Sequence, residues 1–317
     1  MEYRRLGRSG LRVSEVVLGS WLTYGSSVDE PGTAACVRAA LDVGIQTFDT
    51  ADVYALGRAE EVLGHAIAGL PRTDLVLATK VFWPTGKGPN DRGLSRKHVV
   101  ESCHASLRRL GTDYVDVYQC HRFDPEVPLE ETVRAMEDLV RQGKALYWGV
   151  SMWTGAQIAD GLRLARAAGG YGCVCNQPEL SLLERSIEAE VLPVSRREGV
   201  GQWVFSPLAQ GVLTGKYSGG VRPPGTRAAD TQRNRFLEPY LDRKTLERVD
   251  RFAALAAELG MPPARLALAW CLAQPGVDAV VVGATRPEQV RENAAASGTR
   301  LDGATLRRLD ALFPPAH

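Results

Sequence analysis

Four side chains that could carry out proton-transfer chemistry lie at the ends of short apolar runs. Asp49 ends one run and Tyr54 lies just beyond it, Lys80 ends the next run, and His121 follows a third. Taken singly, each has an ordinary structural alternative: a turn-forming or helix-capping carboxylate, a rim aromatic, a solvated lysine, a structural histidine. Their convergence is more informative, because the carboxyl ends of successive parallel strands meet over one pocket.

Together these side chains are suited to the reduction of a carbonyl group. The developing alkoxide needs a proton, and a phenol with an ordinary pKa of ~10 is a poor donor unless a neighbouring cation eases its ionisation. Lys80 supplies that cation, and Asp49 keeps Lys80 charged in a poorly solvated site. His121 is expected to hydrogen-bond the substrate oxygen, which leaves Tyr54 as the general acid.

The elements that must position these residues alternate along the chain. Short β-branched or apolar runs are each followed by a stretch with apolar residues three and four apart, in eight strand–helix pairs. This alternation predicts an α/β protein, a (β/α)₈ TIM barrel in a single domain, residues 1–317. The predicted strands are Val16–Leu18, Gln46–Phe48, Leu75–Ala78, Val115–Tyr118, Ala145–Val150, Gly172–Cys175, Gln202–Phe205 and Ala279–Val282. The predicted helices include Arg58–Ile67, Ser95–Leu110, Leu129–Gln142 and Ser186–Arg197.

Two segments lie outside this alternation. Tyr3–Leu6 and Leu11–Val13 flank a Gly-Arg-Ser-Gly turn, which predicts an N-terminal β-hairpin that caps one mouth of the barrel. Gly211–Tyr240 is rich in Gly, Pro and Arg and lacks periodicity, so it is predicted to be an insertion after strand seven. Long loops in compact domains usually serve function.

Composition argues against several other classes. The 317 residues carry a formal net charge of +1, so there is no basic field to attract nucleic acid or anionic lipid. No apolar run reaches the ~18 residues of a membrane span and the first residues lack a signal peptide's apolar core, so we expect a cytoplasmic protein without membrane association. The cysteines form no CxxC pair and no His lies at ligand spacing, so we expect reduced thiols and no metal site.

The motifs around the four residues resemble signatures of the aldo-keto reductase family, and the resemblance spans nearly the whole chain. Gly44–Tyr54 and Ala78–Lys80 carry it, and Pro128–Trp153 is similar to the branch of potassium-channel β subunits and their bacterial relatives. Phe205–Ala209, Gly211–Tyr217 and Gly283–Asn293 extend the match. The resemblance implies a tetrad of Asp49, Tyr54, Lys80 and His121, with NADP(H) extended across the barrel mouth.

The resemblance also implies where the cofactor would be held. The nicotinamide would meet side chains after strands five to seven, the pyrophosphate would lie under Leu208–Lys216, and the adenosine would meet the segment after strand eight. The residues implied are Trp21, Asp49, Ser151, Asn176, Gln177, Phe205, Ser206, Pro207, Leu208, Gly211, Lys216, Arg227, Gly283, Thr285, Gln289, Glu292 and Asn293. Arg227, and Arg286 at the opening of the last helix, could add charge for a 2′-phosphate. No GxGxxG follows any strand, which argues against a Rossmann domain.

Three residues depart from the channel-subunit pattern. Met152 stands where those subunits tend to carry Arg, and Phe205 where they carry Trp, which weakens the expected cofactor contacts. His121 stands where they typically have Asn, which favours an ordinary reductase over a sensor.

Two other functions compete with the reductase. A regulatory tetramer that docks on a membrane protein and senses NADP is disfavoured by the intact tetrad and by the chain's start at the hairpin, with no extension to plug a pore. A metal-dependent hydrolase needs clustered ligands, whereas only His121 of the five histidines ends a strand. The expected partner is a small carbonyl substrate, bound against aromatic side chains that line the pocket. The protein is expected to be a monomer or a homo-oligomer.

Overall fold

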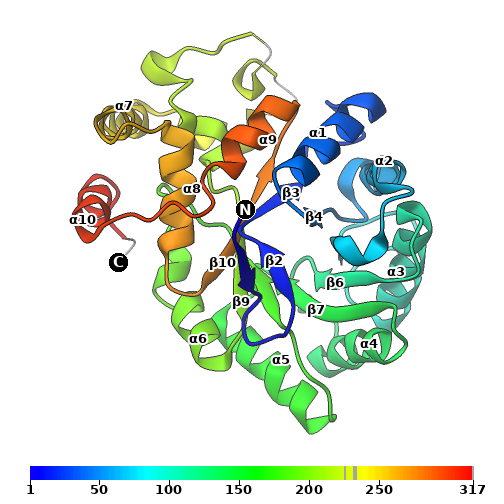
Figure 1. Ribbon diagram of the computed structural model, residues 1–317. Helices are drawn as coiled ribbons and strands as arrows, with labels where there is room; N and C mark the ends of the chain where they lie inside the picture. The colour runs from blue at the N-terminus through cyan, green and yellow to red at the C-terminus, as the bar shows by residue number, and fades with distance from the viewer. Residues whose placement is uncertain (225, 231–233, 316–317) are drawn as a thin grey trace.

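Eight parallel strands close into a barrel in the computed structural model, which describes residues 1–224, 226–230 and 234–315 (Figure 1). The predicted (β/α)₈ barrel with an N-terminal hairpin is confirmed. The order around the ring is β10-β3-β4-β5-β6-β7-β8-β9. The barrel strands are β3 (Val16–Gly19), β4 (Thr47–Asp49), β5 (Val76–Val81), β6 (Val115–Cys120), β7 (Ala145–Ser151), β8 (Cys175–Gln177), β9 (Gly201–Phe205) and β10 (Val277–Gly283).

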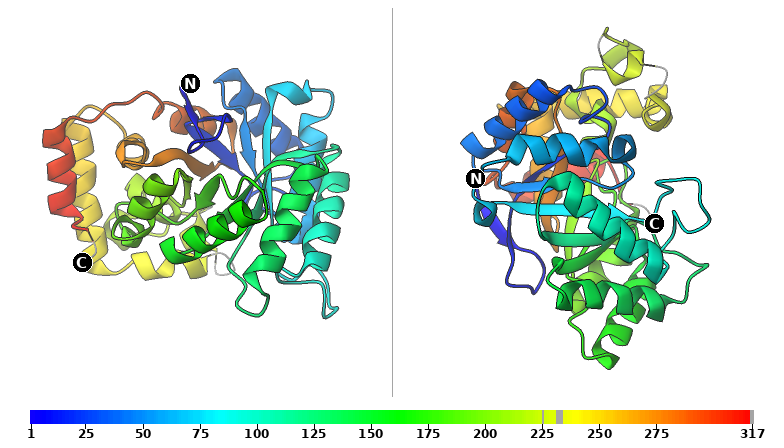
Figure 2. Two further views of the ribbon diagram at one scale, coloured as in Figure 1. Left: turned by 90° about the horizontal axis from the view of Figure 1, so that it is seen from below. Right: turned by 90° about the vertical axis from the view of Figure 1, so that its right-hand side faces the viewer.

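Helices surround the barrel on its outer side (Figure 1). They are α1 (Glu30–Asp42), α2 (Arg58–Ile67), α3 (Arg96–Leu110), α4 (Leu129–Arg141), α5 (Gly155–Ala167), α6 (Val191–Glu198), α7 (Arg243–Glu258), α8 (Pro263–Ala273), α9 (Pro287–Ala294) and α10 (Gly303–Leu312). Arg286 is the N-cap of α9, and the expectation that it opens the last helix is wrong because α10 follows. Figure 2 shows α10 lying alongside α7, outside the barrel ring.

Glycines at the ends of three helices illustrate why helices end where they do. Gly111 and Gly199 cap α3 and α6 with φ of 65° and 79°, and Gly143 follows α4 with φ of 68°. These left-handed conformations are accessible to glycine at little cost.

Two predicted elements differ from the structure. The sixth barrel strand is Cys175–Gln177 rather than Gly172–Cys175, because Gly172 has φ of +82° and the ladder with β7 begins by pairing Gly149 with Cys175. The predicted helix Ser186–Arg197 is a 3₁₀ turn at Ser186–Glu188 followed by α6. Pro193 explains the interruption, since proline is tolerated in the first turn of a helix but not in its interior.

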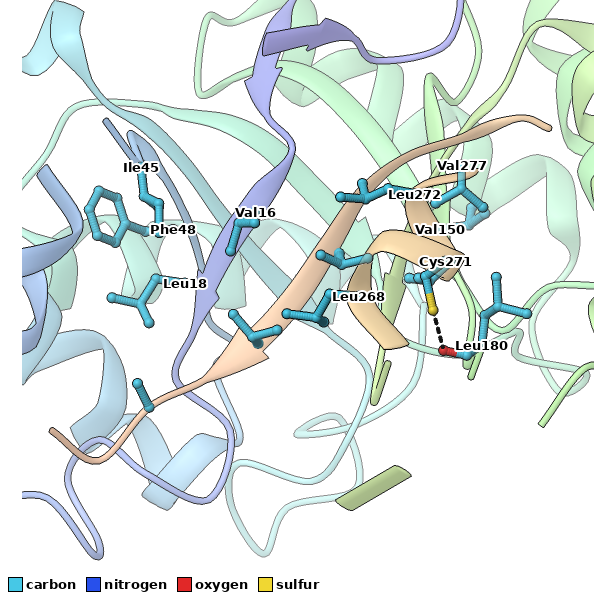
Figure 3. Packing of buried hydrophobic residues seen from close by; sticks show 14 of the residues in the cluster. Val16, Leu18, Ile45, Phe48, Val150, Leu180, Leu268, Cys271, Leu272 and Val277 are labelled. Atoms are coloured by element: carbon cyan, nitrogen blue, oxygen red, sulfur yellow. Dashed lines mark hydrogen bonds between the residues drawn. The ribbon is translucent and has the colours of Figure 1, made fainter. Parts of the chain in front are cut away.

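The core has two layers. Outside the strands, side chains such as Val16 and Leu18 pack in one large cluster with Leu268 and Leu272 of α8 (Figure 3). Inside the barrel, a smaller cluster contains Trp203 and other inward-facing residues of the strands. Strand residues therefore alternate between the two clusters, as the two-residue period of a strand requires.

The hairpin of β1 (Tyr3–Arg5) and β2 (Arg12–Ser14) seals one end of the inner cluster. Leu6 and Val13 are fully buried within that cluster. Arg4 Nη1 donates to the carbonyl oxygens of Leu272 and Val277 at 2.8 and 2.9 Å, which fixes the hairpin to the start of β10. The opposite, carboxyl end of the strands stays open for a site.

The segment after β9 contains the expected insertion. Its described part is built from 3₁₀ turns with no α-helix or strand between β9 and α7. Ser206, Ala209 and Gln210 have φ of 53°, 45° and 59°, conformations that side chains other than glycine adopt rarely. Such backbone geometry is held only where surrounding contacts fix it, and it is frequent at binding sites.

Glu137 on α4 ties that helix to β7 and to the turn before β8. Its carboxylate is buried and accepts hydrogen bonds from Trp148 Nε1 at 2.9 Å and from the backbone N of Gly172 at 2.8 Å. Each donor would lose its partner if the carboxylate were removed.

We therefore expect Glu137→Ala to destabilise the protein by about 2 to 4 kcal/mol, since two buried donors are left unsatisfied. Thermal melts would measure this as a fall in Tm. Glu130→Ala is the matched control, because Glu130 lies on the same helix in an exposed i,i+4 pair with Arg134, worth at most about 0.5 kcal/mol. Equal melting temperatures of the two variants would show that the Glu137 contacts do not stabilise the fold.

Candidate active site

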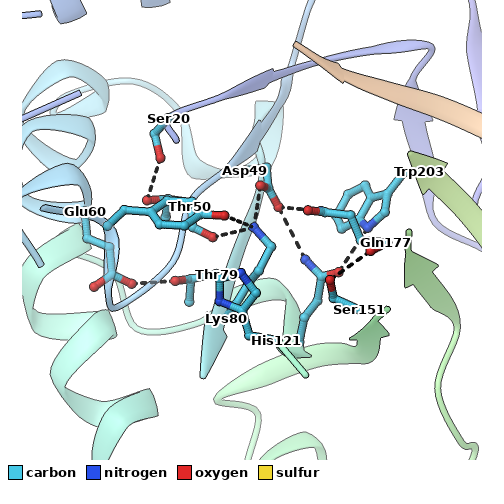
Figure 4. Close-up of polar contacts among 12 residues, drawn as sticks. Ser20, Asp49, Thr50, Glu60, Thr79, Lys80, His121, Ser151, Gln177 and Trp203 are labelled. Atoms are coloured by element: carbon cyan, nitrogen blue, oxygen red, sulfur yellow. Dashed lines mark hydrogen bonds and ion pairs between the residues drawn. The ribbon is translucent and has the colours of Figure 1, made fainter. Parts of the chain in front are cut away.

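A fully buried ion pair lies at the carboxyl ends of β4 and β5. Lys80 Nζ donates to Asp49 Oδ2 at 2.5 Å and to the backbone O of Thr50 at 3.0 Å, and it lies 3.4 Å from Tyr54 Oη (Figure 4). Burial alone would lower the pKa of Lys80, but the charge of Asp49 and the Tyr54 hydroxyl raise it above its ordinary value. Lys80 is therefore a permanent cation beneath the phenol.

Tyr54 lies in a tight turn between β4 and α2, at the rim of a cavity. Ala55 and Leu56 after it have left-handed φ of 49° and 54°. Burial raises the pKa of Tyr54, and Lys80 opposes that shift without cancelling it. The expected easing of ionisation by Lys80 is thus outweighed by desolvation, and Tyr54 is held as a neutral proton donor.

His121 follows β6 and stands edge-on to Tyr54, with ring centroids 5.6 Å apart. Burial, together with the nearby charges of Lys80 and Arg122, lowers its pKa well below the ordinary value. Its Nδ1 is buried without a hydrogen-bond partner. The ring is therefore neutral, and the residue lines the cavity, so that one ring nitrogen can donate a hydrogen bond and the other can accept one.

Asp49 is held from its other side by two amides. Its Oδ1 accepts from Gln177 Nε2 at 2.9 Å and from Gln119 Nε2 at 3.3 Å, and Gln119 Oε1 accepts from Trp203 Nε1 at 3.0 Å (Figure 4). Gln119 is not among the site residues predicted from the sequence. The signal that could have found it is its position two residues before His121, because residues two apart along a strand share a face.

A cavity of about 2130 Å³ opens at this end of the barrel, larger than the ~300 to 1,000 Å³ of a typical small-ligand site. Tyr54 and His121 line it, with Lys80 buried just beneath. Of the residues implied as cofactor contacts, those lining it are Trp21, Asp49, Ser151, Gln177, Phe205, Ser206, Pro207, Leu208, Gly211, Lys216, Arg227, Gly283, Thr285, Gln289, Glu292 and Asn293. The space extends well beyond the four polar residues.

Asn176 is the exception among the implied contacts. It is fully buried, does not line the cavity, and donates through Nδ2 to Gln202 Oε1 at 3.1 Å. Because Cys175 faces the barrel interior, strand alternation turns Asn176 to the outer side and Gln177 back inward. Asn176 is therefore not brought to the site.

Three cations gather at one part of the cavity wall. Lys216, Arg227 and Arg286 line it together, and desolvation with the charges of both arginines lowers the pKa of Lys216. Mutual repulsion of this kind is relieved by a bound anion. Arg227 also donates to Gln210 Oε1, which ties two parts of the segment after β9 to each other.

A second polar cluster lies behind the site, where α2 and α3 meet the barrel. Asp52 is buried and accepts from Ser102 Oγ at 2.7 Å through Oδ2, whereas its Oδ1 has no partner. Glu60 accepts from Thr79 Oγ1 at 2.5 Å and from Arg109 Nε at 2.6 Å. Burial raises the pKa of Asp52 to about 7, with Glu60 adding to the shift and Ser102 opposing it.

Within the described ranges, no group of three or more His, Cys, Asp or Glu side chains is arranged to hold a metal ion. None of the described helices is long and apolar enough to cross a bilayer. All six cysteines are buried free thiols, as expected.

Fold and site together define a barrel protein whose polar groups gather at the carboxyl ends of the strands, the position at which enzymes of this fold carry their chemistry. The sequence profile of the aldo/keto reductase family matches residues 15–313, and the chain belongs to this family, whose members are generally NAD(P)H-dependent enzymes.

Individual relatives cover nearly the full length. A probable voltage-gated potassium channel subunit beta of Oryza sativa subsp. japonica is 46% identical over 93% of this chain and 91% of its own. A probable potassium channel subunit beta of Arabidopsis thaliana is 44% identical over 93% of this chain and 91% of its own length. A putative potassium channel subunit beta of Schizosaccharomyces pombe is 44% identical over 93% of this chain and 87% of its own length. The predicted resemblance to the channel β-subunit branch is confirmed.

The raised pKa of Asp52 makes stability depend on pH. The folded protein holds this proton up to about pH 7, whereas the unfolded chain releases it near pH 4. The stabilisation is therefore complete below about pH 4 and is lost as the pH rises through about 7. We expect Asp52→Asn, which keeps an acceptor for Ser102, to raise Tm relative to wild type more at pH 8 than at pH 5.

Thermal melts at the two pH values test this expectation. Asp113→Asn, the same change at an exposed position, is the control and should show no such pH-dependent gain. An equal effect of Asp52→Asn at pH 5 and pH 8 would mean that Asp52 does not titrate between them.

Proposed function

We propose that this protein reduces a small aldehyde or ketone to an alcohol, with NADPH as the hydride donor and Tyr54 as the general acid. The single observation that carries the proposal is Lys80 Nζ in contact with both Asp49 and Tyr54 at the floor of the cavity. This geometry keeps a cation next to a phenol whose ring is in contact with a neutral histidine.

In this proposal each residue of the tetrad has a separate task. Tyr54 gives its proton to the carbonyl oxygen, and Lys80 stabilises the phenolate that remains. Asp49 keeps Lys80 charged within the buried site. His121, being neutral, can donate one hydrogen bond to the substrate oxygen without competing as an acid.

The residues that would hold NADP(H) fit an extended dinucleotide. Bound there, the cofactor supplies the hydride, and the cavity has room for a substrate beside it. Ser151 and Phe205 line the cavity together with Lys216, Arg227 and Arg286, and Arg286 is the N-cap of α9. This set of polar, aromatic and cationic groups matches an amide, a ring and phosphates.

A second candidate function is redox-dependent regulation of a channel. The relatives of 44–46% identity bear the name of potassium channel β subunits, which favours this role. Both candidates can share one cofactor site, and carbonyl turnover distinguishes them.

Tyr54→Phe is expected to lower kcat for carbonyl reduction by ~10² to 10⁴-fold, because the proton donor is lost while the ring still fills its space. Lys80→Met should do comparable damage and also lower Tm, since Asp49 is left as a buried unpaired charge. The measurements are kcat, the NADPH Kd and thermal melts. If Tyr54→Phe keeps more than about a tenth of wild-type kcat, Tyr54 is not the acid.

NADPH is expected to bind more tightly than NADH by about tenfold or more, because Arg286, Lys216 and Arg227 offer charge-assisted contacts to a 2′-phosphate. Fluorescence titration gives both Kd values. Arg286→Ala should reduce the preference, whereas Arg291→Ala, a change at an exposed arginine of the same helix, should not. Equal affinities for NADPH and NADH would contradict the assignment of these cations to a 2′-phosphate.

A further inference from the structure

Arg122 is a second cation beside the reacting groups, and the proposed chemistry gives it no task. It follows His121 after β6 and lines the same cavity as Tyr54. Its Nη1 donates to the backbone O of His121 at 2.5 Å and lies 3.4 Å from Ser151 Oγ. These contacts hold the guanidinium at the cavity wall.

Arg122 lacks the partner that comparable arginines have. Arg72 and Arg109 are also partly buried and Arg185 is buried, and each pairs with an Asp or Glu carboxylate at 2.6 to 2.8 Å. Across the described residues, no carboxylate lies within 4.0 Å of Arg122. Burial lowers its pKa, and the electrostatic effects of Tyr54 and Glu179, which raise it, do not offset that shift. A desolvated guanidinium with free donors is a site for an anion.

The surroundings of Arg122 limit the shape of that anion. Its Cζ lies 5.6 Å from the centre of the Trp83 ring, and this ring is 6.4 Å from His121. An aromatic surface thus leads from the reacting groups to the cation. Glu179 lines the same cavity, so a dianion such as phosphate would meet more repulsion than a carboxylate with a single charge.

We propose that Arg122 selects carbonyl compounds that carry a carboxylate, binding the carboxylate while the carbonyl faces Tyr54. The inference rests on the reductase function proposed above and names its substrate class. A planar guanidinium can bind a carboxylate through two parallel hydrogen bonds, a geometry that a lysine does not reproduce.

The test compares matched substrates that differ only in charge. The 2-, 3- and 4-formylbenzoates are assayed against the corresponding formylbenzamides with NADPH, and the ratio of the two kcat/KM values is taken for each isomer. We expect wild type to prefer at least one formylbenzoate by about tenfold or more, the usual effect of a charge-assisted hydrogen bond. Arg122→Met should reduce that ratio to near one, whatever its effect on the rates themselves.

Arg235→Met is the matched control. Arg235 also lines the cavity but stacks on Phe236 in the exposed segment before α7, so its loss should leave the ratio within about twofold. A wild-type ratio near one for all three isomers overturns the proposal. A high ratio that survives Arg122→Met also overturns it, because the carboxylate is then recognised elsewhere.

A binding measurement separates this inference from the proposed reaction. Benzoate and benzamide are titrated into the NADP⁺-saturated protein, wild type and Arg122→Met, by calorimetry. Tighter binding of benzoate by wild type alone supports the carboxylate site even if none of the aldehydes is reduced, an outcome that would count against the reductase. Equal binding of benzoate by both proteins overturns the site even if the aldehydes are reduced.

Discussion

The buried contact between Lys80 and Asp49 is the interaction on which the site depends. Enclosing two charges costs several kcal/mol of solvation for each ion unless hydrogen bonds replace the lost water. Here the replacements are Thr50 O for Lys80, with the amides of Gln119 and Gln177 for Asp49. Thr50 directly follows β4, Gln119 lies in β6 and Gln177 lies in β8, so the closed barrel brings all three to one ion pair.

The two ends of the barrel have different roles. At one end the hairpin fills the interior with Leu6 and Val13, and Arg4 pairs with buried Glu15 at 2.5 Å, so that every inward group there serves stability. At the other end the described residues form no such plug, and the inward-facing positions at the ends of β4 and β5 hold Asp49 and Lys80 instead of apolar side chains. The same alternation of strand residues thus produces a core at one end and a reactive floor at the other.

Much of this arrangement follows from local sequence patterns, and some does not. The hairpin, the barrel and the meeting of Asp49, Tyr54, Lys80 and His121 follow from periodicity and from strand ends. The orientation of Asn176 did not, because the predicted strand ended at Cys175 and left the next two residues in a loop, where alternation does not apply. The burial of Asp52 and its contact with Ser102 depend on how α3 packs against the barrel, a long-range property that no local pattern encodes.

Lys80 and Arg122 show how two cations at one site can have different uses. Lys80 is enclosed and fully partnered, so its charge acts on Tyr54 and is not available to a ligand. Arg122 is partly buried, and its contacts leave most of its donors without a charged partner, so its charge is directed into the cavity. Both cations oppose the rise in the pKa of Tyr54 that burial causes. A carboxylate bound at Arg122 would offset part of the lowering effect that Arg122 has on the pKa of Tyr54. Substrate binding and the acidity of Tyr54 would then be coupled through one guanidinium.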